Sequence, residues 1–250
     1  MRMVCRSSCV RCALPYHEHD GVEEGVAMTR VSAEDSLVGA LYATLRERII
    51  LGEYPQGAKL PETTLAADLN VSRVPIREVL PLLERDGLIR TNPRRSAVVH
   101  SWDHASVTDL FEVRLALEPL AAEYAARRVA AGADPAPLHR AFADAVAAIE
   151  QGDPITIAAT NADLHRVILD LADNELLRQM MRPVLVRMNW IFFLTSDRDT
   201  DVQCSEHRHL VEAIAAGEGA LARFLASAHV EGGRVPTFAA LAGHLGEKAE

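Results

Sequence analysis

The sequence has few aromatic residues. Phe, Trp and Tyr make up 5% of the 250 residues, although hydrophobic residues make up 49%. This scarcity argues against an aromatic-rich β-sandwich. Alanine supplies much of the apolar fraction and is the best helix former, so we expect helices packed against helices. The apolar content also excludes a wholly disordered chain.

Long apolar runs are absent as well. The most apolar stretch, residues 183–195, covers about 13 residues and contains Arg187. A membrane-spanning helix needs about 20 apolar residues, so we expect no membrane span. Residues 1–15 lack the apolar core of a secretory signal. The four cysteines are too few for a disulfide framework in a chain of this length, which favours a cytoplasmic protein with reduced thiols.

Three of the four cysteines, Cys5, Cys9 and Cys12, lie near the start of the chain. Their spacing is compatible with an iron–sulfur cluster or zinc and resembles the radical-SAM signature, but no alternation of strands and helices follows. Residues 1–35 show no periodicity, so we interpret them as a disordered leader, with Met28 as an alternative start of translation. If the leader is functional, its cysteines favour a metal- or redox-sensing regulator.

The sequence of residues 36–100 predicts a winged helix-turn-helix. Apolar residues recur at helical spacing in three segments, and two short β-rich runs then flank an Asn-Pro turn. Three helices followed by a small hairpin make up this fold. The predicted elements are helices over 36–51, 62–69 and 72–86 and strands over 88–91 and 97–99.

The second and third of these helices meet the demands of a helix-turn-helix. Ala66 is the small residue that allows close crossing, and Asn70 in the turn tolerates a positive φ. Ile76 and Val79 are the apolar residues expected to lock the two helices together.

Arginines stand where this motif reads DNA. Arg73 and Arg77 are one turn apart at the start of the third helix, the end that reaches base edges in the major groove. Arginine can contact guanine bidentately or hold a phosphate. Ser72 can cap the same helix. Arg94 and Arg95, at the hairpin tip, suit phosphate or minor-groove contacts.

After Trp102 the pattern is almost entirely helical. We assign residues 101–232 to an all-helical bundle of six to seven helices and residues 233–250 to a weakly ordered tail. The predicted fold class is mainly α, a winged helix-turn-helix followed by this all-α bundle. The predicted bundle helices cover 109–131, 138–151, 155–171, 175–195, 201–216 and 219–230.

The distribution of charge separates the two domains. The chain contains 26 basic and 35 acidic residues, which at first argues against binding to a polyanion. Residues 36–100, however, contain 9 basic and 7 acidic side chains, and the acidic excess belongs mainly to the bundle. The winged domain is therefore slightly basic, with its arginines concentrated at one helix end and at the hairpin tip.

Two stretches carry a family resemblance. KLPETTLAADLNVSRVPIREVLPLLERDGLI resembles the winged helix of GntR-family bacterial transcription regulators, and FEVRLALEPLAAEYAARR resembles the start of the FCD effector-binding domain of the FadR-type branch. Together these likenesses cover roughly residues 36–231. The resemblance implies a homodimer that binds a double-stranded operator with palindromic half-sites. It also assigns Arg73 and Arg77 to the recognition helix.

The winged domain departs from the family pattern at three positions. Thr64 stands where many relatives carry an arginine in the second helix, so we retain it with Ser72 as a candidate DNA contact. Ser96 replaces the usual glycine of the wing tip. Pro81 lies inside the third helix, where proline kinks or ends a helix at a cost of about 3 kcal/mol.

The bundle carries a possible metal site. Asn161 and His165 are four residues apart and share one helix face, while His207 and His229 lie on later helices. Three imidazoles and one amide oxygen can bind a divalent ion. The stretches NADLH, EHRHLVEAI and SAHV resemble the metal-binding FCD branch, except that Asn161 replaces an aspartate. We expect zinc, with nickel or manganese as alternatives.

The same resemblance implies a small organic-acid effector that binds at or near the metal. Arg114 matches a pocket position of relatives, although it can also pair with Glu118 within its own helix, and Arg166 is a weaker candidate. An acyl-CoA effector belongs to the other branch of the family. We therefore expect a ligand-responsive transcriptional regulator, with repression the commoner mode, rather than an enzyme.

A metal-dependent hydrolase on a helical bundle is the alternative, because zinc with an open position can activate water. The sequence contains no HExxH motif. Glu206 is the only candidate general base beside the histidines, and we expect it to point elsewhere on its helix.

Overall fold

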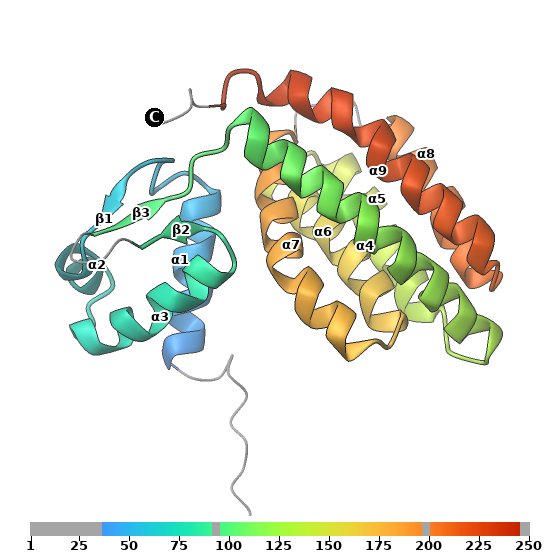
Figure 1. Ribbon diagram of the computed structural model, residues 1–250, viewed down its shortest axis with the longest axis horizontal. Coiled ribbons are helices and arrows are strands. Elements are labelled where there is room, and N and C mark those ends of the chain that lie inside the picture. Colours follow the sequence, from blue (N-terminus) through green and yellow to red (C-terminus); the bar gives the residue numbers. More distant parts are fainter. Residues whose placement is uncertain (1–36, 92–95, 197–200, 246–250) are drawn as a thin grey trace, which may run out of the picture.

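The structure, a computed structural model, describes residues 37–91, 96–196 and 201–245. A small winged domain is followed by a larger helical bundle (Figure 1). The winged domain contains α1 (Leu37–Ile50), β1 (Lys59–Leu60), α2 (Glu62–Asp68), α3 (Arg73–Arg85), β2 (Ile89–Arg90) and β3 (Ala97–Val99). The bundle contains α4 (His104–Ala130), α5 (Ala136–Gln151), α6 (Pro154–Leu171), α7 (Glu175–Leu194), α8 (Asp201–Ala215) and α9 (Gly219–Leu241).

The core of the winged domain lies between α1, α3 and the sheet. Leu45 and Ile49 of α1 and Leu83 of α3 are buried because apolar residues recur on one face of each helix. The sheet has the order β1-β3-β2 and is antiparallel throughout. The predicted hairpin of β2 and β3 is confirmed. β1 is not predicted, because two residues are too few to show a period.

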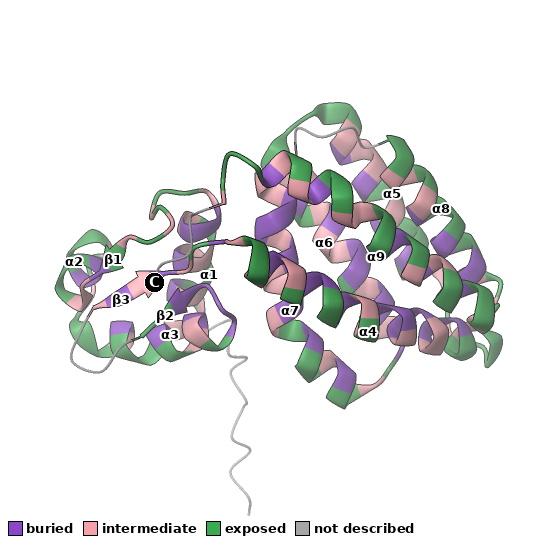
Figure 2. Cartoon of the chain, turned by 45° about the horizontal axis from the view of Figure 1, so that its top comes forward, coloured by how far each residue is buried: buried purple, intermediate pink, exposed green. Residues whose placement is uncertain are grey.

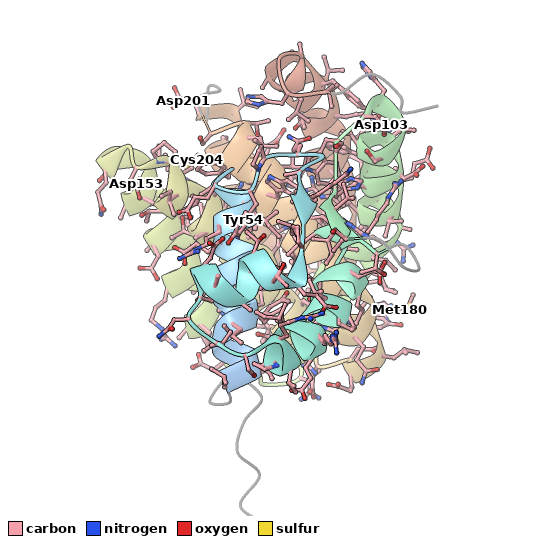
Figure 3. All side chains as sticks on the ribbon, turned by 90° about the vertical axis from the view of Figure 1, so that its left-hand side faces the viewer. Tyr54, Asp103, Asp153, Met180, Asp201 and Cys204 are labelled. Carbon is pink, nitrogen blue, oxygen red and sulfur yellow. The ribbon has the colours of Figure 1, made fainter. Side chains whose placement is uncertain are left out.

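In the bundle, α4 packs against α6, α8 and α9, and it runs alongside α9 (Figure 1). Buried residues face the inside of the bundle and exposed ones cover its outer surface (Figure 2). Asp103 caps α4 by accepting a hydrogen bond from the Ser106 backbone at 2.7 Å, and Asp153 caps α6 in the same way (Figure 3). Such caps fix where these helices begin. No helix in the described part of the chain is long and apolar enough to cross a membrane.

The end of the bundle differs from the prediction. α9 continues through Gly232 and Gly233 to Leu241, and Leu241 is fully buried. The weakly ordered tail assigned to residues 233–250 is therefore wrong for residues 233–241. Packing of Leu241 and the neighbouring turn against the bundle overrides the low helix propensity of the two glycines.

The predicted leader, residues 1–35, with Cys5, Cys9, Cys12 and the alternative start Met28, lies outside the described residues.

The winged domain contacts the bundle through α7. Trp102, just before α4, lies edge-on to Trp190 of α7 with ring centroids 5.6 Å apart. The chain contains two tryptophans, and both lie at this contact. Gly87, which follows α3, has a φ of 77° and lies against Arg187 of α7 so closely that a Cβ atom would clash with the guanidinium. The end of the recognition helix and the bundle are therefore in direct contact.

Candidate DNA-reading and metal-binding sites

α2 and α3 form the helix-turn-helix. Asn70, in the turn between them, has a φ of 51°, a left-handed conformation that asparagine tolerates better than most residues. Ala66 is buried at the contact between the two helices, and Ile76 and Val79 are fully buried beneath α3. The small residue, the turn residue and the apolar contacts predicted from the sequence are all present.

The two arginines predicted to read DNA, Arg73 and Arg77, share one acidic partner. Arg73 and Arg77 project from the start of α3, with side chains 52% and 59% exposed. Glu62, the first residue of α2, accepts hydrogen bonds at Oε2 from Arg73 Nη2 at 2.8 Å and from Arg77 Nε at 2.7 Å. These hydrogen bonds hold the pKa of Glu62 below its ordinary value, so the carboxylate is ionised at neutral pH. Sequence reasoning missed Glu62 because no helical spacing links it to residues of the next helix.

The other candidate DNA contacts surround this arginine pair. Thr64 is exposed on α2. Ser72 occupies the N-cap of α3 in an extended conformation, but its hydroxyl does not make the predicted capping hydrogen bond. α3 continues through Pro81, which lies on the exposed side of the helix where its ring has room. Arg94 and Arg95 lie outside the described residues.

Three buried histidines from three helices meet in the bundle. His165 of α6, His207 of α8 and His229 of α9 each place one ring nitrogen within 4.8 Å of the others. The Nε2 atoms of His207 and His229 are 3.1 Å apart. Residues separated by up to 64 positions are thus brought to one point by the packing of α6, α8 and α9 around α4.

Two glutamates contact the Nδ1 atoms of two of these rings. Glu118 Oε2 lies 2.9 Å from His165 Nδ1, and Glu206 Oε2 lies 2.8 Å from His229 Nδ1. Both contacts leave Nε2 of the ring available toward the centre of the cluster. Carboxylates commonly orient metal-ligating histidines in this way. The sequence did not indicate that Glu118 takes this part.

The expectation that Glu206 points away from the histidines is wrong. It does project from a different side of α8 than His207, but α9 packs on that side and brings His229 to it.

Two buried atoms beside the cluster have no hydrogen-bond partner among the described residues: His165 Nε2 and Asn161 Oδ1. The two residues are one turn apart on α6 and share a face. Leaving a buried polar atom unpaired costs free energy. Imidazole nitrogens and amide oxygens both ligate divalent cations. The residues present therefore fit a metal ion.

The charges around the cluster also suit a cation. Burial lowers the pKa of His229, although the hydrogen bond to Glu206 opposes the effect, so this imidazole is in the neutral form that binds metals. Burial would raise the pKa of Glu118, but Arg114 and His165 outweigh it and hold that pKa well below its ordinary value. An ionised carboxylate therefore contacts His165 through one oxygen while its other oxygen accepts from Arg114.

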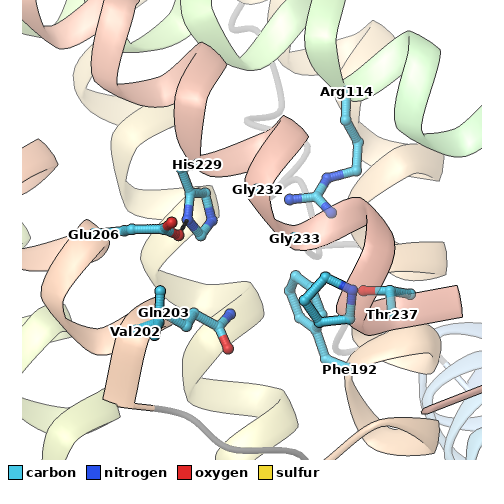
Figure 4. Close-up of a pocket in the computed structure, with 10 residues that line it drawn as sticks. Arg114, Phe192, Val202, Gln203, Glu206, His229, Gly232, Gly233 and Thr237 are labelled. Atoms are coloured by element: carbon cyan, nitrogen blue, oxygen red, sulfur yellow. Dashed lines mark hydrogen bonds and ion pairs between the residues drawn. The ribbon is translucent and has the colours of Figure 1, made fainter. Parts of the chain in front are cut away.

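A cavity of about 60 Å³ opens beside His229. Arg114 and His229 point into it from different helices, and Glu206, Gln203, Phe192 and Thr237 also line it (Figure 4). Arg114 is buried and donates from Nε to Glu118 Oε1 at 2.6 Å, so the predicted pairing within α4 is present. The cavity therefore places the Arg114 guanidinium and one histidine of the cluster, His229, around one space.

Arg166, the weaker effector candidate, does not line this cavity. It follows His165 on α6 and projects from another side of the helix, where its Nε donates to Asp163 at 2.7 Å and its Nη1 to Asp170. Its side chain is half exposed. The position of Arg166 therefore does not support the prediction that it binds the effector.

Comparisons with known proteins identify both domains. Residues 37–99 match the bacterial regulatory proteins of the gntR family, and residues 109–232 match the FCD domain. The HTH-type transcriptional regulator YdhC of Bacillus subtilis is 30% identical over 176 residues, which cover 69% of this chain and 78% of YdhC. A protein of Paenarthrobacter nicotinovorans, named as a transcriptional repressor of a D-xylose utilization operon, is 28% identical over 73% of this chain and 80% of its own length.

Solved structures share the fold. McbR/YncC of E. coli aligns with a TM-score of 0.70 at 21% identity, covering 82% of this chain and 98% of that one. A GntR transcriptional regulator from Rhodococcus sp. RHA1 aligns with a TM-score of 0.67 at 22% identity, covering 81% and 97%. The relatives are regulators and give no support to the hydrolase alternative. The chain belongs to the GntR family of bacterial transcriptional regulators, with an FCD domain as its second part, and is a regulator rather than an enzyme.

Proposed function

We propose that this regulator is a repressor whose operator affinity is controlled by a small organic acid bound at or near a divalent metal ion in the bundle. The convergence of three buried histidines, one of which, His229, lines a cavity together with Arg114, carries this proposal. Repression is supported by relatives named as repressors of a D-xylose utilization operon and of a gluconate operon.

His165, His207 and His229 would hold the ion, together with Oδ1 of Asn161. Zinc is the first choice for a site rich in imidazole, and nickel and manganese are alternatives. Asn161 neutralises less charge than the aspartate of the metal-binding relatives, so we expect weaker binding. The bound ion would supply positive charge and an open position for a ligand oxygen.

Arg114 would give the effector site its preference for an acid. Its guanidinium is held by Glu118 and stacked over the rings of Phe111 and Phe192, at 5.1 and 5.5 Å from their centroids. A carboxylate in the cavity would therefore meet a cation that is already oriented. The cavity of about 60 Å³ suits a small hydroxy, keto or sugar acid better than a long acyl chain.

Arg73 and Arg77 would read the operator in the major groove, with Thr64 and Ser72 beside them. Arg94 and Arg95 would contact phosphates from the wing. One winged helix reads too few base pairs for useful specificity, so we infer a homodimer on palindromic half-sites.

Thermal-shift measurements on the full chain test the effector and the metal together. Zinc-loaded and chelator-stripped protein is mixed with lactate, pyruvate or gluconate, and with the uncharged lactamide and glucose. An acid present at 100 times its Kd should raise Tm of the zinc-loaded protein by about 5–10 °C. The stripped protein and the uncharged compounds should show no such shift.

His165→Ala should abolish both the zinc content and the acid-dependent shift. His209→Ala is the matched control, because His209 is exposed on α8 two residues from His207. An acid that stabilises the stripped protein as much as the zinc-loaded one would contradict the metal-dependent site.

A further inference from the structure

Glu62 stands in an unusual position for an acidic residue in a DNA-reading domain. One of its oxygens, Oε2, bridges the guanidinium groups of Arg73 and Arg77, the two arginines proposed above to read the operator. Its side chain is 31% exposed, beside two arginine side chains that are more than half exposed. A negative charge is thus built into the surface that must approach a polyanion.

The bridge leaves a defined set of donors available. A guanidinium has five N–H groups, and the contacts with Glu62 use Nε and Nη2 of Arg73 but only Nε of Arg77. Within the described part of the chain, the two Nη groups of Arg77 have no recorded acceptor. The Glu62 contact therefore fixes the plane of this guanidinium and leaves its outer edge for a bidentate partner such as O6 and N7 of guanine.

The negative charge of Glu62 also weakens the binding of phosphate to the two arginines. Two guanidiniums bridged by one carboxylate carry one net positive charge, so a phosphate is attracted less and must displace or face Glu62. Guanine O6 and N7 are neutral acceptors, so Arg77 can contact them while it keeps its bond to Glu62. The carboxylate thus disfavours backbone contacts, which carry no sequence information, relative to base contacts.

We propose that Glu62 is a specificity-determining residue of the reading head, which orients Arg73 and Arg77 toward bases and weakens their binding to phosphates. It is a positioning residue, since it acts through the two arginines. The proposal rests on the proposed role of this arginine pair in operator reading.

The test uses the full chain and the variant Glu62→Gln, which keeps the shape of the side chain and removes its charge. An operator is first selected from a random duplex library with the wild-type protein. Kd is then measured by fluorescence anisotropy for that operator and for a scrambled duplex, over a series of salt concentrations. Glu78→Gln is the matched control, because it removes the same charge from an exposed position of α3 whose carboxylate does not pair with Arg73 or Arg77.

Glu62→Gln should bind the scrambled duplex several-fold more tightly and steepen the salt dependence of that binding by about one unit of slope. The ratio of operator to scrambled affinity should fall by about tenfold, while Glu78→Gln keeps the wild-type ratio within about twofold. An unchanged ratio in Glu62→Gln would overturn the inference, as would an equal loss of affinity for both duplexes.

Arg77→Ala separates this inference from the proposed function. If Arg77→Ala keeps wild-type operator affinity, the assignment of the reading arginines fails. If Arg77→Ala loses operator binding while Glu62→Gln keeps the wild-type ratio, only the role of Glu62 fails.

Discussion

Each of the two domains contains a glutamate that bridges two nitrogen-bearing side chains, and the two bridges differ mainly in burial. In the winged domain, Glu62 joins Arg73 and Arg77 at a surface where all three side chains are between 31% and 59% exposed. In the bundle, Glu118 joins Arg114 and His165, and none of these three side chains is more than 8% exposed. In each case one carboxylate contacts two side-chain nitrogens, but the surrounding medium is different.

Burial decides what each cluster can do. Exposed ion pairs contribute little to stability because water and salt screen them, so the bridge made by Glu62 leaves both arginines accessible to a partner at the surface. In the bundle, Glu118 uses both oxygens, one for each partner, and the low dielectric makes the contacts strong. The exposed cluster is therefore suited to reading a partner, and the buried one to holding side chains in place.

The largest effect expected from this comparison is on stability. Glu118→Ala should lower the free energy of unfolding of the metal-free protein by about 3–5 kcal/mol, because it leaves Arg114 buried without a compensating charge. Urea unfolding followed by circular dichroism measures this. Replacing both members of the pair, as in Arg114→Met with Glu118→Leu, should recover most of the loss. A loss of less than about 1 kcal/mol in Glu118→Ala would break the contrast between the two clusters.

A smaller effect is expected at the other glutamate of the histidine cluster. Glu206→Gln should weaken zinc binding by about 10- to 100-fold, because the carboxylate that orients His229 and raises its basicity is lost. Competition with a chromophoric chelator measures the affinity. The control is Glu212→Gln, an exposed glutamate on the same helix, which should bind zinc as the wild type does. Equal affinities in the two variants would show that Glu206 has no part in the site.

Sequence patterns predicted the elements and the clustered histidines better than the glutamates that contact those histidines. The helical period located α5 to α8 within about two residues, because each of these helices buries one apolar face. The predicted start of the first bundle helix at residue 109 was too late, since α4 begins at His104 behind its Asp103 cap. The predicted end of α9 failed at Gly232 and Gly233, where tertiary packing outweighs helix propensity.

The histidines were candidates because family likeness marks all three and i,i+4 spacing places Asn161 on the same helix face as His165. Glu118 and Glu206 have no such mark, because their contacts to His165 and His229 depend on how α4, α6, α8 and α9 pack. The bridge from Glu62 to α3 likewise depends on the angle between α2 and α3. Spacing within one helix can be read from a sequence, whereas a contact between helices requires the fold.

The smallest expected effect completes the contrast with Glu118. Glu62→Ala should change the free energy of unfolding by less than about 1 kcal/mol, because an exposed bridge gains little over hydrated side chains. Most of that change should disappear in about 1 M salt, where the Debye length falls to about 3 Å. Urea unfolding at low and high salt measures both quantities. A salt-independent loss of unfolding free energy as large as that of Glu118→Ala would mean that Glu62 stabilises the winged domain. The presence of an acidic residue beside Arg73 and Arg77 would then be explained by stability rather than by DNA binding.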